Sequence, residues 1–307
     1  MVSGNKKTLI LILLSLFIVI LFFNSVFIFP AFYAEPLSFG TLAVLVFTMS
    51  FFSAVVISTL LVYVLPQINT EISLSKKFTR LDSLNHPLLL KLSTQAPGSY
   101  HHSINVANLS HQAAKSIGAN AALVRIASYY HDIGKIIHPE TYIENQNGRK
   151  IINNNLSQIN KVAKIITNHA LSGKEIAKEY DLPDEIIQII SEHHGTTSAK
   201  FLFDQAKEFG SPDIKNFRYP GPKPQTVESL IVMLADCIEA AAKGLKDLDR
   251  VNIAKLVDNT IKEKIDEKQF SNINFSSSDY QKIRNSFIKT LLSMYHQRIV
   301  NKEYNEN

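Results

Sequence analysis

Cysteine is almost absent from this sequence, with Cys237 as its only example. A single cysteine excludes an internal disulfide framework and fits a reducing compartment. Sustained alternation of apolar and polar residues is lacking as well, which argues against strands and favours a nearly all-α domain. No internal repeat or low-complexity tract is present.

Charged side chains are missing from two long apolar runs near the start of the chain, residues 8–29 and 37–66. At about 1.5 Å of rise per residue, a helix of either length crosses a hydrocarbon layer of about 30 Å. A cleaved signal peptide has a shorter apolar region and does not explain the second run, and a buried core helix is the other alternative. We expect two transmembrane helices, at about 8–29 and 38–65.

Lysine and arginine are missing from the link between the two runs, residues 30–36. Basic residues flank the outer ends of the pair instead: Lys6, Lys7, Lys76, Lys77 and Arg80. Because positive flanking charge stays on the cytoplasmic side, we expect a multi-pass protein of the cell membrane with both termini in the cytoplasm. The formal net charge of +5 then needs no polymeric nucleic acid as a partner, since part of it reflects topology and part can serve an anionic ligand or the lipid bilayer.

From residue 99 onward the apolar residues recur at helical spacing, as in Val106, Leu109 and Ala113. The predicted helices lie near 99–117, 120–133, 156–169, 171–180, 183–194, 198–209, 225–244, 250–266 and 277–300. Residues 217–226 contain three prolines and a glycine and predict a loop. We expect a membrane region at 1–67, a connector helix at 68–98, a helical domain at 99–300 and a frayed tail at 301–307.

A histidine and an aspartate stand side by side where one predicted helix ends. Adjacent helical residues point about 100° apart, so His131 and Asp132 face one small ligand only if it lies between them. A metal ion can do so, because a carboxylate has two oxygens and can bridge two ions. We expect Gly134 to cap the end of this helix.

Further potential metal ligands lie on predicted inward faces or at the ends of other helices. They are His102, His169, His193, His194 and Asp236. Taken alone, His102 or His169 fits a hydrogen-bonded core histidine better than a metal ligand, and Asp236 fits a structural ion pair equally well. So many buried polar groups on separate helices nevertheless indicate a metal site. A set of nitrogen and oxygen ligands without thiolate favours Fe, Mn or Zn.

The order His102, His131-Asp132, Asp236 resembles the HD phosphohydrolase superfamily. A closer resemblance, over about residues 80–245, is to the membrane-bound HD-domain cyclic di-AMP phosphodiesterases of bacteria. The segments that carry it are NHPLLLKLSTQAPGSYHHSINVANLS, YYHDIGKI, IENQ, EHHGTT, YPGPKPQT and MLADCIEAA.

This resemblance implies an all-α HD-domain helical bundle, preceded here by two transmembrane helices, that holds two divalent metal ions, Mn or Fe. The first ion would be bound by His102, His131, Asp132 and Asp236. The second would be bound by Asp132, His169, His193 and His194, with Asp132 as the bridge.

Two metal ions a few ångströms apart can activate a bridging water and offset the charge on a phosphodiester. The function implied is hydrolysis of cyclic di-AMP to pApA, with Asp132 and Lys135 as catalytic residues. Lys135 either supplies a point charge to a phosphate or simply faces solvent. Expected substrate contacts lie in loops after the metal-bearing elements: Thr196, Thr197, Arg218, Tyr219 and Lys223.

Two features depart from the family pattern. The link 30–36 is too short to fold an external sensor, and residues 147–160 lack an expected Asn-Pro-His run. Alternative functions are hydrolysis of another nucleotide, such as cyclic di-GMP or guanosine tetraphosphate, and slow turnover in a membrane nucleotide receptor. EHHGTT differs from the motif of cyclic di-GMP enzymes, and a homo-oligomer is left open.

Overall fold

The computed structural model describes residues 77–146 and 155–305, together with scattered positions between 38 and 55. The chain divides into two compact units, Met1–Lys77 and Phe78–Asn307. The predicted span at 8–29 lies outside the described residues, as does most of the span at 38–65. Within the described part, no helix combines the length and the apolar character needed to cross a membrane.

The second unit is built from helices, and its described residues form no strand. Its elements, in chain order, are α5 (Pro87–Gln95), α6 (Pro97–Ile117), α7 (Ala121–Tyr130), η3 (Ile133–Ile137), η4 (Pro139–Thr141), η5 (Ile143–Asn145), α8 (Leu156–Glu179), α9 (Asp184–Glu192), α10 (Lys200–Lys207), η6 (Ile214–Phe217), α11 (Val227–Ala242), α12 (Arg250–Asp266) and α13 (Ser277–Asn305). Only an isolated antiparallel bridge joins Ser198 to Arg218 in this part. The all-α prediction is confirmed for this unit.

Local capping explains where several helices begin. The side-chain oxygens of Asn155, Thr226 and Asp249 each accept a hydrogen bond from the backbone N–H three residues later, at the starts of α8, α11 and α12. Gly118 ends α6 in the left-handed conformation with φ of 75°. These boundaries follow from short-range chemistry, and the predicted helices agree with them to within a few residues.

The segment expected as one connector helix, 68–98, has a different form over its described residues. Residues 77–81 are helical, a turn follows, and α5 then begins at Pro87, where proline cannot continue an upstream helix. The side chains of Leu88, Leu89 and Leu92 are fully buried in the main core. α5 therefore belongs to the helical domain rather than to a linker.

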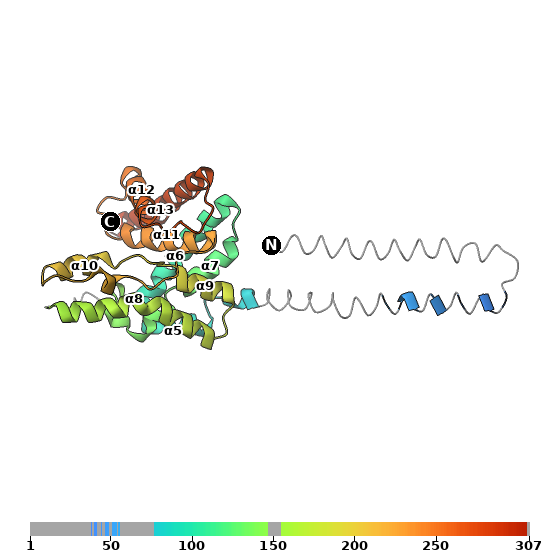
Figure 1. Ribbon diagram of the computed structural model, residues 1–307. Coiled ribbons are helices and arrows are strands. Elements are labelled where there is room, and N and C mark those ends of the chain that lie inside the picture. The colour runs from blue at the N-terminus through green and yellow to red at the C-terminus, as the bar shows by residue number, and fades with distance from the viewer. Residues whose placement is uncertain are drawn as a thin grey trace. The chain divides into compact units, whose positions relative to one another are not determined.

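A single helix, α8, replaces the two helices predicted at 156–169 and 171–180. Nothing between them breaks a helix, and Gly173 is tolerated because it packs closely against Gly134 and Ile190. Its first half contributes Ile159 and Ala163 to a small apolar cluster with α10 and η6, and its second half joins the main core. In Figure 1, α8 (yellow-green) lies on one side of the domain and α11 to α13 (orange to red) on the other.

Candidate metal centre

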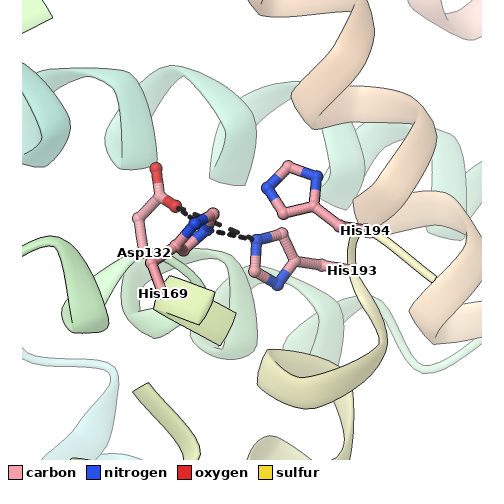
Figure 2. Close-up of side chains that lie close together, drawn as sticks. All are labelled: Asp132, His169, His193 and His194. Atoms are coloured by element: carbon pink, nitrogen blue, oxygen red, sulfur yellow. Dashed lines mark hydrogen bonds and ion pairs between the residues drawn. The ribbon is translucent and has the colours of Figure 1, made fainter. Parts of the chain in front are cut away.

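The seven predicted metal ligands come together at the centre of the helical domain. One group contains Asp132, His169, His193 and His194, and the other contains His102, His131 and Asp236. Within each group the potential ligand atoms lie within 4.8 Å of one another. They are brought from α6, the turn after α7, α8, the turn after α9, and α11. Figure 2 shows the group of four residues assigned to the second ion, in which three imidazoles lie beside the Asp132 carboxylate.

Asp132 lies between the two groups and turns one oxygen toward each. Its Oδ1 is 3.2 Å from His169 Nε2 and 3.8 Å from His193 Nε2. Its Oδ2 is 3.4 Å from His131 Nε2 and 3.7 Å from His102 Nε2. A carboxylate in this position can bridge two cations, one through each oxygen.

Three of the histidines are oriented by the same backbone contact. In each, ring Nδ1 lies within hydrogen-bond distance of the carbonyl three residues earlier, so Nδ1 carries the proton and Nε2 presents its lone pair. The pairs are His131 with Ser128 at 2.8 Å, His169 with Ile166 at 2.6 Å, and His193 with Ile190 at 2.7 Å.

This arrangement fits a metal ion and is unfavourable for a chain without one. His131 Nε2 is buried and has no hydrogen-bond partner among the described residues. The Nε2 atoms of His169 and His193 lie 3.2 Å apart, as the dashed line in Figure 2 marks, so two lone pairs oppose each other. A cation among these nitrogens and the Asp132 oxygens satisfies all of them.

Electrostatics place Asp132, Asp236 and His193 in the protonation states that metal binding needs. Burial alone raises the pKa of Asp132, but His131 and Lys135 outweigh it and hold that pKa well below its usual range. Burial likewise opposes ionisation of Asp236, yet its hydrogen bond with His102 and the nearby His131 ring keep its pKa low. Burial, with other imidazoles nearby, lowers the pKa of His193 to about 3.

Glu239 is a functional candidate that the sequence analysis missed. Its Oε2 lies 2.5 Å from His102 Nδ1 and 2.8 Å from Lys243 Nζ, and its Oε1 accepts from Asn105 Nδ2 at 2.9 Å. Burial lowers the pKa of His102, but hydrogen bonds with Asp236 and Glu239 outweigh it and raise the pKa to about 9. The sequence did contain a signal for this role, because Glu239 lies three residues after Asp236 on an apolar helix and so shares its face.

Lys135 is neither solvent-facing nor free. Its Nζ lies 2.7 Å from Asp132 Oδ2 and 2.8 Å from Glu144 Oε1, and its side chain is only 12% exposed. Glu144 also accepts a hydrogen bond from Ser99 Oγ at 2.9 Å. The lysine therefore links the bridging carboxylate to η5 and to the start of α6.

Asn145 completes that connection by capping α6 from a distance. Its Oδ1 accepts from the backbone N–H groups of Gly98 and Ser99, at 2.8 and 3.2 Å. Ala96 precedes the helix and offers no side-chain cap of its own. The end of η5, 46 to 47 residues later in the sequence, thus supplies the cap for the helix that carries His102.

Gly134 has a different role from the predicted helix cap. α7 ends at Tyr130, and Gly134 lies inside η3. A Cβ at this position would lie 1.9 Å from the carbonyl oxygen of His169 and 2.6 Å from the nitrogen of Gly173. Glycine is needed because the backbone that follows Asp132 passes directly against α8, which also shows that His169 lies within that helix and not at its end.

The expected substrate contacts lie in two loops beside the group that contains His194. Tyr219 stacks on His194, with ring centroids 4.1 Å apart and planes at 23°. Thr197 Oγ1 donates to the His194 carbonyl at 2.8 Å, and Arg218 Nη1 donates to the Thr196 carbonyl at 2.9 Å. Lys223 lies farther out, where its Nζ is 3.5 Å from Ser271 Oγ.

Comparison with known proteins finds similar sequences and a similar solved domain. The HD domain family matches residues 99–241. Cyclic-di-AMP phosphodiesterase PgpH of Bacillus subtilis (strain 168) is 37% identical over 267 residues, covering 86% of this chain and 37% of that protein. The protein of the same name from Listeria monocytogenes serotype 1/2a (strain 10403S) is 40% identical, covering 73% of this chain and 31% of that protein.

A solved structure is also similar. The crystal structure of the L. monocytogenes PgpH HD domain in complex with cyclic-di-AMP aligns with a TM-score of 0.64 and 38% identity, over 69% of this chain and 98% of that one. The chain spans about a third of the length of the curated relatives it matches.

Proposed function

This chain belongs to the HD domain family, and on that premise we propose that it is a metal-dependent phosphodiesterase that hydrolyses cyclic di-AMP to pApA. The observation that carries the proposal is the position of Asp132, with one oxygen toward each of two groups of ligand atoms. The cyclic dinucleotide is suggested by the relatives named for that activity and by the similar domain solved with cyclic-di-AMP.

The cofactors proposed are two divalent metal ions, Mn or Fe, because the donors are imidazoles and carboxylates without thiolate. One ion is assigned to His102, His131, Asp132 and Asp236. The other is assigned to Asp132, His169, His193 and His194. When bound, such a pair supplies the Lewis acidity that lets water attack a phosphodiester at neutral pH.

The chain's own groups position the substrate around that pair. Lys135 places a positive charge 2.7 Å from the bridging carboxylate, where its ammonium can also meet a phosphate oxygen. Tyr219 forms a flat wall against His194. Arg218 is exposed and Lys223 partly exposed beside it, which suits a second phosphate. Thr196 and Thr197 lie in the loop after His194, and the Thr197 carbonyl accepts a hydrogen bond from the Tyr219 N–H.

We assign the protein to the cytoplasmic face of the cell membrane, with two spans at about 8–29 and 38–65 and a linker ahead of the helical domain. Support comes from the two uncharged runs and from the basic residues at their outer ends. Among the described positions, Phe47 and Phe51 leave 73% and 62% of their surface exposed, which suits contact with lipid.

A turnover assay tests the proposed function. The full chain, purified in detergent and loaded with Mn or Fe, should convert cyclic di-AMP to pApA and should act more slowly on cyclic di-GMP and guanosine tetraphosphate. An Asp132→Asn variant serves as the inactive control. Tight binding of cyclic di-AMP with intact recovery would favour the receptor alternative, and faster hydrolysis of another nucleotide would reassign the substrate.

A further inference from the structure

The turn between α12 and α13 has a fixed geometry. Lys268 adopts φ of +57°, its N–H donates to the Ile265 carbonyl at 2.8 Å, and the N–H of Gln269 donates to the Lys264 carbonyl at 3.0 Å. These are the two backbone hydrogen bonds of a Schellman cap, with Lys268 in the left-handed position. The cap determines the direction in which the Gln269 side chain leaves the helix end.

Gln269 is polar at a position where this cap usually places an apolar side chain. Its usual partner position is occupied by Lys264, so the local apolar contact that accompanies the motif is absent here. Gln269 is nevertheless 1% exposed. A buried polar residue that breaks a local rule points to a requirement elsewhere in the molecule.

Gln269 is needed to bind the loop immediately after the His193-His194 pair. Gln269 Oε1 accepts from the Thr196 N–H at 3.1 Å, and Nε2 donates to Thr196 Oγ1 at 3.1 Å and to the Glu267 carbonyl at 3.0 Å. A Cβ on Gly195, which has φ of +53°, would lie 2.2 Å from Gln269 Oε1. One buried amide thus binds the backbone N–H and the hydroxyl of Thr196 and fills the space that Gly195 leaves.

His194 is the metal-site histidine that depends most on this loop. His131, His169 and His193 are oriented by a carbonyl three residues earlier, whereas His194 turns its Nδ1 into the site, 3.6 Å from Asp236 Oδ2. Its orientation comes instead from elements beyond it in the sequence.

Those elements are connected to the residue that Gln269 holds. The Thr197 hydroxyl donates to the His194 carbonyl, and the Tyr219 ring stacks on the imidazole. The Tyr219 N–H donates to the Thr197 carbonyl at 2.9 Å, and Arg218 binds the Thr196 carbonyl at 2.9 Å. Movement of Thr196 would therefore reach both groups that orient the His194 ring.

We propose that Gln269 is a positioning residue for His194, which it holds toward the second metal ion by clamping Thr196. The proposal rests on the proposed function in that it takes His194 as a ligand of that ion. α12 and α13, the C-terminal helical pair, lie beyond the family match at 99–241, and the proposal makes the turn between them part of the metal centre.

Metal stoichiometry tests the proposal without relying on turnover. The full chain in detergent is stripped of metal, equilibrated with a graded series of Mn concentrations up to saturation, and measured by elemental analysis. Wild type should bind two ions per chain, whereas Gln269→Leu should keep one and bind the second about tenfold more weakly or worse. Gln269→Glu keeps the acceptor for the Thr196 N–H but loses the donor, so an intermediate loss is expected.

Ile261→Val is the matched control, because Ile261 is buried in α12 and its truncation loosens the same helical pair without touching Thr196. It should lower the melting temperature and keep both ions. Two ions bound with unchanged affinity in Gln269→Leu, or in Gln269→Glu should the first variant not fold, would overturn the proposal. An equal loss of metal affinity in Ile261→Val would also overturn the proposal. Fewer than two ions bound to wild type would instead contradict the proposed two-metal function.

Discussion

At the scale of single residues, the centre is organised around the two oxygens of Asp132. Because each oxygen faces a different group of imidazoles, the two metal sites share this one side chain. His169, by contrast, contacts only one group. The two residues should therefore differ in what their removal does.

We predict that Asp132→Ala abolishes binding of both ions and that His169→Ala chiefly empties the second site. The reason is that an alanine at 132 removes the carboxylate that faces both groups, whereas an alanine at 169 removes one of four ligands from one site. Elemental analysis of the two purified variants measures this division. Equal depletion in both would contradict the assignment of ligands.

Glu239 offers a second prediction at this scale. Its carboxylate accepts a hydrogen bond from His102 Nδ1 and so raises the basicity of the nitrogen that faces Asp236. Glu239→Gln keeps the shape but removes the charge, and metal affinity at the His102 site should fall about 10-fold to 100-fold. Competition with a fluorescent chelator measures the loss, and Glu179→Gln, at an exposed position, should leave affinity unchanged.

At the scale of elements, the contact between η3 and α8 fixes the distance between Asp132 and His169. The two backbones approach so closely at Gly134 that no side chain fits between them. The 3.2 Å separation of Asp132 Oδ1 from His169 Nε2 depends on this approach. α8 in turn is held by two apolar clusters, one at each half.

Gly134→Ala should therefore be strongly destabilising. Its Cβ would meet backbone atoms that cannot rotate away, and we expect a loss of about 3 kcal/mol in the free energy of unfolding. Gly244→Ala is the control, because its Cβ would have only an ordinary contact at 3.5 Å. Denaturant unfolding of both variants measures the difference, and a Gly134→Ala protein as stable as the control would contradict the packing described.

At the scale of the whole molecule, opposed pKa shifts set how metal-free protein responds to pH. The pKa of His102 is raised from 6.5 to about 9, so the folded chain holds that proton more tightly than the unfolded chain. The stability this contributes is complete below about pH 6.5 and is lost as pH rises through about 9. The pKa of His193 is lowered to about 3, so stability is lost as pH falls below about 6.5 toward 3.

Metal-stripped protein should consequently be most stable near pH 6.5, with losses on both sides. Thermal unfolding from about pH 4 to about pH 10 measures the profile. His102→Asn should flatten the alkaline side, because it removes the group that loses its proton there. An alkaline decline of the same size in that variant would show that another group causes it.

Short-range sequence signals predicted the fold class, most of the helices and the potential metal ligands. Helical spacing, N-cap side chains and the proline-rich loop act over a few residues, so they predicted the all-α class and most of the helices. The adjacent His131-Asp132 and His193-His194 pairs gave the positions of potential ligands, and the structure places all seven predicted ligands together. The sequence analysis divided α8 into two helices although no residue between them breaks a helix, and the structure shows one continuous helix over Leu156–Glu179.

The helices and the types of metal ligand could be predicted from the amino-acid sequence, because neighbouring residues carry both signals. Only the tertiary structure decided which polar groups support the ligands. Glu239 meets His102 across 137 positions, and Gln269 meets Thr196 across 73. Such contacts depend on how helices pack around the core, and no local pattern records which buried polar groups will face each other when they do.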